Sequence, residues 1–566
     1  MEKRKQRYGK RFNIGKASLL AGCYGAIFIV ILYPLVMLFR GSFINPTGHP
    51  TLEYIINLVT DKAIRESLLN TLIISLGATL LSIAAGVSMG WALSRTNMPL
   101  KNLIRNVSFL SLLTPPFLGA IAWVFLLGPR AGKINVFIER VLHFDSPFNI
   151  FTTSGIIFVS FLYVYPFVLN ATASSLDNMD PSLEHAGRML GASTWKTNLK
   201  ITFPLILPAI MGGAILSFLE AAAFFGIPSV LGVPVGIYTL SSRIYYFFQT
   251  FPPKFEQGAA TAIPLLLITA LLLFAQRRLM GRRRFTVITG KAEHPQIIDI
   301  GRWKYLLLGF CLAVISLSIF IPYSTLLVVS LSRVWGIPLS WENLTLENFR
   351  FILFGYKLAR VSIKNSFLLA ILAASLGLVL AFISSFSVER TPTRANRLMS
   401  FLIMVPFAIP GIAMATGFLW AYISPPFVLY GTVWILVVAY IARRVPLAFT
   451  NCRDGIRQLN PELEESAINL GASWIKTVKE VTIPLIKGNL VTSWLFIFIL
   501  SFRELSTSIL LYTPNNEVMA VTIFTLFEEG EFEALSALAI MLLGVILIGI
   551  YLARKIVGTG FMEIKR

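Results

Sequence analysis

Long apolar stretches recur along the whole chain, separated by polar or basic segments. A run of about 18 apolar residues can cross roughly 30 Å of hydrocarbon as a helix. The period-two alternation of a membrane β-barrel is absent from the sequence. The pattern therefore predicts an all-α, polytopic membrane protein. It predicts twelve spans, at about 18–39, 67–93, 107–127, 156–176, 205–226, 257–276, 305–331, 365–387, 400–422, 431–451, 488–511 and 534–553.

Composition supports this class. Apolar residues make up 55% of the 566 residues, charged residues make up 14%, and the mean hydropathy is +0.73. Soluble domains carry about a quarter charged residues.

One polar segment occurs twice, at residues 181–206 and 461–486, with a constant offset of 280. Thirteen of the 26 aligned positions are identical. The basic segment 277–304 divides the spans into two groups of six, which predicts two tandem six-helix units in parallel orientation. The predicted divisions are 1–66 (basic tail, first span and outer loop), 67–276 (first transmembrane domain), 277–304 (cytoplasmic linker), 305–364 (seventh span and outer loop) and 365–555 (second transmembrane domain).

The net charge of +21 is unevenly distributed. Of the 49 Lys and Arg residues, 35 fall in one alternating set of loops and tails. Positively charged loops stay on the cytoplasmic side, so this set and both termini are predicted to be cytoplasmic. The charge is thus a topology signal, with anionic membrane lipid as a secondary partner, and it does not indicate nucleic-acid binding.

The repeated segment predicts a helix–turn–helix. Asp180 or Asn460 is expected to cap the first helix, which Gly191 or Gly471 ends. Ser193 or Ser473 is expected to cap a second short helix. Pro204 and Pro484 are expected to end that second helix at the membrane.

The first short helix carries a Leu/Ala face, formed by Leu183, Ala186 and Leu190 in one copy and by Leu463, Ala467 and Leu470 in the other. Such a face either docks in a groove on a soluble partner or packs back on the membrane domain. In the first case, two copies predict two copies of the partner.

Several spans contain candidate pathway residues. Pro115 and Pro116 interrupt the third predicted span, and Pro406 and Pro410 interrupt the ninth. These breaks either line a transport pathway or are packing kinks.

Glu220 and Glu504 lie toward the far ends of the fifth and eleventh spans. Ionisable residues inside a membrane are costly and usually functional. The two carboxylates either flank a pathway or, for Glu504, pair with Arg503 or with a partner on another helix to hold the bundle.

Other chemistry is not indicated. No GxxxxGK[ST] segment is present to hold ATP phosphates, and no nucleophile–base set or metal-ligand spacing argues for an enzyme. The three Cys and four His residues are scattered, so no metal ligands are assigned. A permease and an ion-gradient secondary transporter both fit these observations.

The repeated loop resembles the EAA motif of type I ABC importer permeases, in which Glu-Ala-Ala precedes a Gly and, later, Ile-x-Leu-Pro. Glu465, Ser466, Ala467 and Gly471 fit this pattern. The first copy places His185 at the position of the acid, with Glu184 one residue before it.

The resemblance implies that both loops are coupling helices for two copies of an ABC ATPase, which binds ATP and Mg²⁺, while this chain carries no cofactor. An extracytoplasmic substrate-binding protein is the implied delivery partner, and the bacterial inner membrane the implied location. The implied coupling residues are Glu184, His185, Ala186, Gly191, Pro204, Glu464, Glu465, Ala467, Gly471 and Pro484.

The segment 504–524 (ELSTSILLYTPNNEVMAVTIF) is similar to iron(III) importers of the Fbp/Afu/Sfu type. Ferric iron is therefore the expected substrate, with phosphonates, sugar phosphates, thiamine and polyamines as alternatives.

Overall fold

The computed structural model describes residues 21–143, 147–180, 182–281, 297–337, 340–391 and 393–557. Within these ranges the chain forms helices and four isolated β-bridges, which confirms the predicted all-α class. The basic tail before residue 21, most of the linker 277–304 and Pro181 lie outside the described residues.

Nine described helices are long and apolar enough to cross a membrane, and three bent pairs bring the number to twelve. The bent pairs are Lys101–Leu113 with Pro116–Leu127 (100°), Arg394–Ala408 with Gly411–Tyr422 (114°) and Trp474–Leu485 with Lys487–Phe502 (78°). The first two bends lie at the predicted proline breaks. The third lies two residues after Pro484, which was expected to end the second short helix of the repeated segment at the membrane.

The chain forms two compact units, and these are not its two consecutive halves. The first-half unit comprises residues 53–350 and 526–540; the second-half unit comprises residues up to 52, 351–525 and those from 541 onward. Each unit therefore takes one span from the other half of the sequence.

The helices of the first-half unit are α3 (Glu53–Thr60), α4 (Lys62–Arg95), α5 (Lys101–Leu113), α6 (Pro116–Leu127), α7 (Lys133–Leu142), α8 (Thr153–Asp177), α9 (Ser182–Met189), α10 (Thr194–Thr197), η2 (Asn198–Thr202), α11 (Phe203–Ala223), α12 (Gly226–Leu231), η3 (Val233–Val235), α13 (Leu240–Gln249), α14 (Phe255–Gly281), α15 (Trp303–Ile315), η4 (Ser316–Phe320), α16 (Ile321–Ser330), η5 (Trp341–Asn343) and α17 (Glu347–Arg350).

The helices of the second-half unit are η1 (Phe28–Leu32), α2 (Tyr33–Ser42), η6 (Phe351–Gly355), α18 (Lys357–Arg390), α19 (Arg394–Met404), η7 (Val405–Ala408), α20 (Gly411–Tyr422), α21 (Val433–Arg457), α22 (Glu462–Asn469), α23 (Trp474–Thr477), η8 (Val478–Thr482), α24 (Ile483–Leu485), α25 (Lys487–Phe502) and α26 (Ser508–Leu511). The last two helices, α27 (Met519–Glu529) and α28 (Phe532–Val557), each contribute to both units.

The first span packs on α20 in the second-half unit. Two glycines permit the close approach: a Cβ on Gly417 would lie 2.7 Å from the Pro34 carbonyl oxygen, and one on Gly41 would lie 2.6 Å from the Trp420 ring. Small residues commonly allow such close packing between membrane helices, where van der Waals contact replaces the hydrophobic effect.

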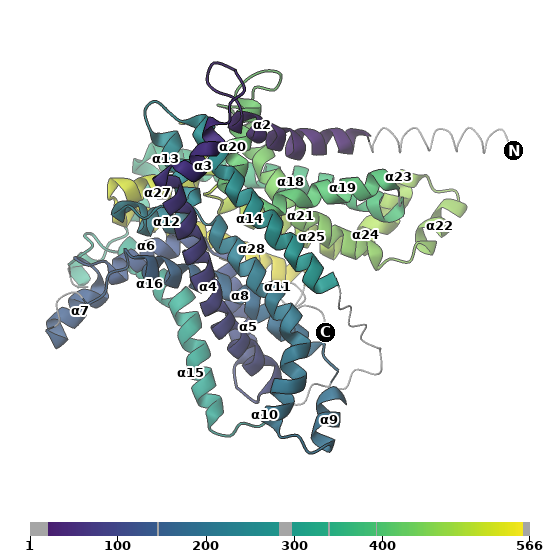
Figure 1. Cartoon of the computed structure of the whole chain (residues 1–566), viewed down its shortest axis with the longest axis horizontal. Helices are drawn as coiled ribbons and strands as arrows, with labels where there is room; N and C mark the ends of the chain where they lie inside the picture. Colours follow the sequence, from purple (N-terminus) through teal and green to yellow (C-terminus); the bar gives the residue numbers. More distant parts are fainter. Residues whose placement is uncertain are drawn as a thin grey trace. The chain divides into compact units, whose positions relative to one another are not determined.

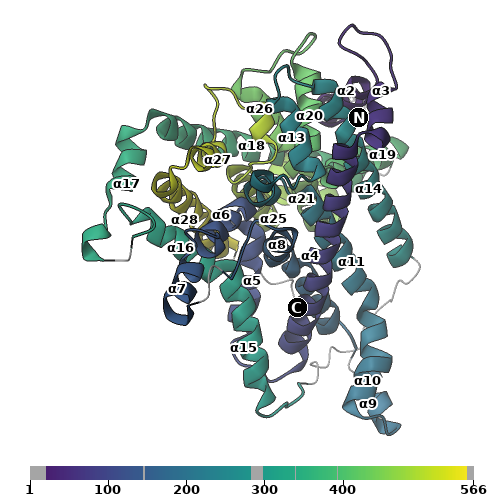
Figure 2. The ribbon, with the colours of Figure 1, turned by 60° about the vertical axis from the view of Figure 1, so that its left-hand side comes forward.

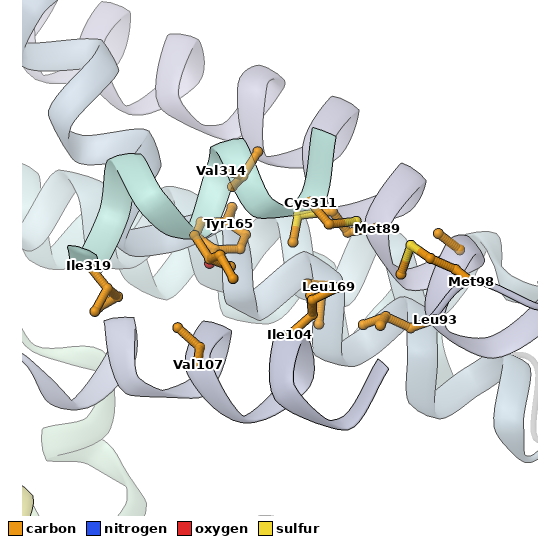
Figure 3. Close-up of a cluster of buried hydrophobic side chains, with 12 residues drawn as sticks. Met89, Leu93, Met98, Ile104, Val107, Tyr165, Leu169, Cys311, Val314 and Ile319 are labelled. Atoms are coloured by element: carbon orange, nitrogen blue, oxygen red, sulfur yellow. The ribbon is translucent and has the colours of Figure 1, made fainter. Parts of the chain in front are cut away.

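The seventh span (α15, η4 and α16) packs in the first-half unit. Cys311, Val314 and Ile319 from this span meet side chains of α4, α5 and α8 in one buried apolar cluster (Figure 3). The remaining members of the cluster include Met89, Ile104 and Leu169. The exchange of the two spans therefore rests on close packing in each unit.

Two 34-residue helices, α4 and α18, run through their units and end at Arg95 and Arg390. Figures 1 and 2 show α4 running toward the end of its unit where α9 and α10 lie. These two helix ends position the site described next.

Candidate functional site

The repeated loop folds in both units as the predicted helix–turn–helix. Its first helix is α9 or α22, and its second short helix is α10 or α23. The Asp180 carboxylate accepts the Ser182 N–H at 2.9 Å, which lowers the pKa of Asp180 from its ordinary value. The Asn460 side chain accepts the Glu462 N–H at 3.1 Å. Both first helices are therefore capped by the side chains that the sequence indicated.

Glycine ends both first helices with a left-handed backbone. The φ angles of Gly191 and Gly471 are +82° and +91°, a region that only glycine enters at little cost. The hydroxyls of Ser193 and Ser473 then accept the N–H groups of Lys196 and Lys476, each at 3.3 Å. The same residue types therefore make the same local turn between the two short helices of each loop.

The predicted role of Pro204 is wrong. Pro204 lies in the first turn of α11, and the chain stays helical from Thr194 to Ala223. The π-helical turn η2 precedes it, and a register shift of this kind is a common way to accommodate a residue without an N–H. Around Pro484 the helix does break, with a 78° bend at Ile486.

The Leu/Ala faces of the loops are exposed. Leu190 and Leu470 are 89% and 90% exposed, and Leu183 and Leu463 are about half exposed. In the first loop these residues border an apolar groove of about 430 Å³, lined by Leu183, Ala186, Gly187, Leu190, Lys200, Ile201, Pro204 and Leu205. Exposed apolar side chains gathered on an ordered helix are typical of a docking surface.

Two adjacent positions in each loop differ in their exposure to solvent. His185 and Glu465, at the motif's acid position, are exposed, as are Ala186 and Ser466. Glu184 and Glu464, one residue earlier, are buried.

Each buried glutamate is bound by an arginine and a threonine. Glu184 pairs with Arg95 at 3.4 Å and accepts the Thr202 hydroxyl at 2.8 Å.

Glu464 pairs with Arg390 at 2.8 Å and accepts the Thr482 hydroxyl at 2.9 Å. The sequence analysis missed these four partners. One signal was present, because the Glu and the Thr are both among the identical positions of the repeat.

The proline breaks lie where the sequence placed them. Pro115 is buried and precedes α6, which Pro116 opens. Pro406 and Pro410 are buried on either side of the 114° bend, Pro410 directly before α20.

Glu504 is buried between two arginines of α21. Its carboxylate pairs with Arg443 at 2.5 Å and with Arg444, and it also accepts the Thr507 N–H at 3.1 Å. A Cβ on Gly411 would lie 2.2 Å from the Arg443 guanidinium, so the cluster lies against the start of α20. Both arginines lie near the middle of this 25-residue helix, although they belong to the 35 Lys and Arg residues that were assigned from the sequence to cytoplasmic loops and tails.

Glu220 differs from Glu504. It is exposed near the end of α11 and makes none of the ion pairs found among the described residues. The structure therefore does not bring the two carboxylates into equivalent surroundings. Nor do the described residues contain any group of three His, Cys, Asp or Glu side chains placed to hold a metal ion.

Comparison with known proteins identifies the family. The model described as "Binding-protein-dependent transport system inner membrane component" matches residues 82–285 and 373–558. The chain is 25% identical over 538 residues to the ferric transport system permease protein FbpB of Actinobacillus pleuropneumoniae, covering 94% of this chain and 76% of that protein.

It is also 32% identical over 205 residues to the molybdenum transport system permease protein ModB of Escherichia coli (strain K12), covering 36% of this chain and 86% of that protein. A crystal structure of a bacterial ABC transporter for alginate import matches 50% of this chain and 99% of the matched chain, at 19% identity and a TM-score of 0.41. Because the two matched segments of the family model cover more than half of the sequence, the chain belongs to the family of inner membrane components of binding-protein-dependent transport systems, with two copies of the family's domain.

Proposed function

We propose that this permease works with two ATPase subunits, one docked on each repeated loop. The observation that carries the proposal is the pair of helices α9 and α22 with their exposed leucine side chains, one helix in each of the two segments that match the family. The chain itself is a permease subunit and not an enzyme, so ATP and Mg²⁺ would be bound by the ATPase.

In this proposal a substrate-binding protein delivers substrate at the outer face. ATP closes the two ATPases and moves the two loops, and the helices then exchange outward for inward access. The two repeated loops, at 181–206 and 461–486, and both termini are cytoplasmic in this arrangement, in keeping with the excess of Lys and Arg on that side of the chain. The breaks at Pro115, Pro116, Pro406 and Pro410 are candidate linings of the pathway.

The proposed substrate is ferric iron. The support is the ferric permease relative, whose similarity extends over nearly the whole chain. The membrane carboxylates add little to this support. Glu504 is already paired with Arg443 and Arg444, and Glu220 makes none of the ion pairs found among the residues that the structure describes.

A specific observation favours a second candidate, an anionic substrate such as a phosphonate or a sugar phosphate. Arg443 and Arg444 are partly accessible, with side chains 17% and 13% exposed in the middle of α21. Guanidinium groups bind phosphate-like oxygens through paired hydrogen bonds.

The docking proposal is tested by co-purification with the ATPase subunit. Gly471→Asp, or deletion of residues 461–484, should abolish ATPase retention while the protein still inserts in the membrane. Gly236→Asp, at another exposed left-handed glycine in an outer loop, is the matched control. Retention of the ATPase by both loop variants would contradict the proposal.

The substrate is tested on the partner binding protein. Titration with iron(III), a phosphonate, a sugar phosphate and thiamine should show tight binding of iron(III) alone. Tight binding of a phosphorus oxyanion instead would favour the second candidate. Uptake that continues without ATP and stops when the ion gradient collapses would contradict both and indicate a secondary transporter.

A further inference from the structure

Two carboxylates are buried in a part of the molecule that is otherwise exposed. Glu184 and Glu464 are 3% and 8% exposed, although they lie on the short surface helices α9 and α22. Burying a carboxylate costs free energy unless it is paired and hydrogen-bonded. Their contacts therefore show what each loop is attached to.

Each carboxylate joins three elements. Arg95 and Arg390 are the last residues of the long helices α4 and α18. Thr202 and Thr482 lie 18 residues after their glutamates, in the π-helical turns η2 and η8. The glutamate thus connects the exposed helix of the loop to the end of a long membrane helix and to the turn that leads into the next span. We call each Arg–Glu–Thr set a clamp.

The clamp occurs once in each compact unit. The two Glu and the two Thr residues obey the offset of 280, whereas the arginines are 295 residues apart and lie outside the gapless repeat. The arginines end the helices α4 and α18, which follow the offset of 295 and not that of 280. The fold nevertheless brings each arginine to the buried glutamate of its own unit. Two independent copies of one arrangement indicate a function that both halves share.

The residues proposed to dock the ATPase and the residues of the clamp lie on different sides of each loop. The exposed side carries Leu190 or Leu470 and the acid position, His185 or Glu465. The buried side carries the clamp.

We propose that Glu184 and Glu464 transmit the movement of the ATPase to α4 and α18, by holding each loop and its long helix together as one rigid body. They are positioning residues, and the inference rests on the proposed docking of ATPases on the loops.

The two clamps are not equally strong. The Arg390 guanidinium hydrogen-bonds both Glu464 oxygens and donates to the Ile456 and Leu459 carbonyls at 3.3 and 3.5 Å. The Arg95 guanidinium is fully buried, and its nitrogens make none of the hydrogen bonds found in the described part of the chain, so its contact with Glu184 is an ion pair alone.

Residues of the linker support the first clamp instead. The Ile298 N–H donates to the Arg95 carbonyl at 2.8 Å, and the Asn97 amide donates to the Asp299 carboxylate at 2.5 Å. The second clamp, being held by its own side-chain hydrogen bonds, is expected to be the stiffer one.

The test measures one distance in the complex of the full chain with its ATPase. Spin labels are placed at Val379 on α18 and Ile468 on α22, which are 56% and 42% exposed, and Ile468 is not among the residues of the Leu/Ala face. The native Cys23, Cys311 and Cys452 are first replaced by Ala. Distance distributions are recorded by pulsed electron paramagnetic resonance without nucleotide and with ATP and vanadate.

We expect the unsubstituted clamp to give one narrow distribution that is the same in both states. Glu464→Gln should keep the ATPase bound. It should broaden the distance distribution between the two labels and shift it when ATP is trapped with vanadate. The amount of substrate transported per ATP hydrolysed should fall. Glu464→Asp, which keeps the charge, should restore most of the narrow distribution. Glu462→Gln is the matched control, because it changes an exposed carboxylate of the same helix that is not among the docking residues, and it should leave the distance unchanged.

Two results would overturn the inference. One is a Glu464→Gln distribution identical to that of the unsubstituted clamp in both states. The other is loss of the ATPase in proportion to the loss of transport, which would make Glu464 a docking residue. If the Glu464→Gln protein does not accumulate, Thr482→Val replaces it, because this variant keeps the ion pair. It should broaden the distance distribution by a smaller amount. An unchanged distribution in Thr482→Val would also count against the clamp. Failure of even the unsubstituted chain to retain an ATPase would instead reject the docking proposal, and this inference with it.

Discussion

The two halves of this permease are alike at their repeated loops and unlike in the middle of the membrane. Both loops have the same caps, the same left-handed glycine and the same Arg–Glu–Thr clamp. At the offset of 280, however, Arg443 and Arg444 of α21 correspond to Tyr163 and Val164 of α8.

The surroundings of these residues differ as well. Tyr163 packs against Gly119 of α6, and Arg443 packs against Gly411 at the start of α20, so aligned positions of α8 and α21 hold an aromatic side chain in one half and a cation in the other. The duplication has kept the caps, the left-handed glycine and the clamp residues in both loops, where two identical partners are proposed to dock, although the acid position and the clamp contacts differ. It has diverged at the charged cluster that Arg443 and Arg444 of α21 form with Glu504.

The largest expected effect comes from a substitution that disrupts the charged cluster of the second half. Glu504→Ala leaves Arg443 and Arg444 without their carboxylate, and removing one partner of a buried pair typically costs about 3–5 kcal/mol. We expect a marked fall in the thermal unfolding temperature in detergent.

Glu220→Ala is the counterpart in the first half. It removes an exposed carboxylate, so the change should stay within about 0.5 kcal/mol. Similar destabilisation by both variants would contradict the asymmetry.

The next effect tests the symmetry of the loops. Gly191→Val and Gly471→Val meet no atom within 4 Å, so their cost is the left-handed backbone alone, about 1–2 kcal/mol each. Hydrogen exchange should show faster opening of α9 and α22 by similar factors. Gly488→Val, at a glycine with open space and an ordinary φ, controls for side-chain size. A large effect in only one loop would show that the loops are not equivalent.

A smaller effect separates the two clamps. Thr202→Val and Thr482→Val each remove a hydrogen bond to a buried carboxylate, worth about 1.5–3 kcal/mol because one partner is charged. Since Arg390 still hydrogen-bonds Glu464, the second loop should lose less protection against proteolysis than the first. Equal loss in both loops would show that the additional Arg390 hydrogen bonds do not matter.

The smallest effect restores the motif's acid position in the first loop. His185 is exposed, and His185→Glu would make it match Glu465. An exposed ion pair with a partner is worth about 0.2–1 kcal/mol, so ATPase affinity should rise by at most about fivefold. The change is measured as the dissociation constant of the ATPase from the unsubstituted chain and from the variant, at low and at high salt. Tighter binding that persists at high salt would argue against a simple surface charge.

The sequence by itself determined the membrane class, the approximate spans, the repeat and the local structure of the loops. These features depend on short-range physics: the length of an apolar helix, the capping of a helix by Asp180 or Asn460, and the left-handed backbone at Gly191 and Gly471. It also located the breaks at Pro115 and Pro410, because a proline lacks an N–H wherever it occurs.

Only the tertiary structure decided which groups meet across the sequence. It exchanged the first and seventh spans between the units, paired Glu184 with Arg95 and Glu464 with Arg390, and enclosed Glu504 between two arginines some 60 residues earlier. It also carried the helix through Pro204, where the local pattern predicted an end. The physical reason is that a buried charge is stable only beside a partner, and the fold, not the local pattern, chooses which distant partner that is.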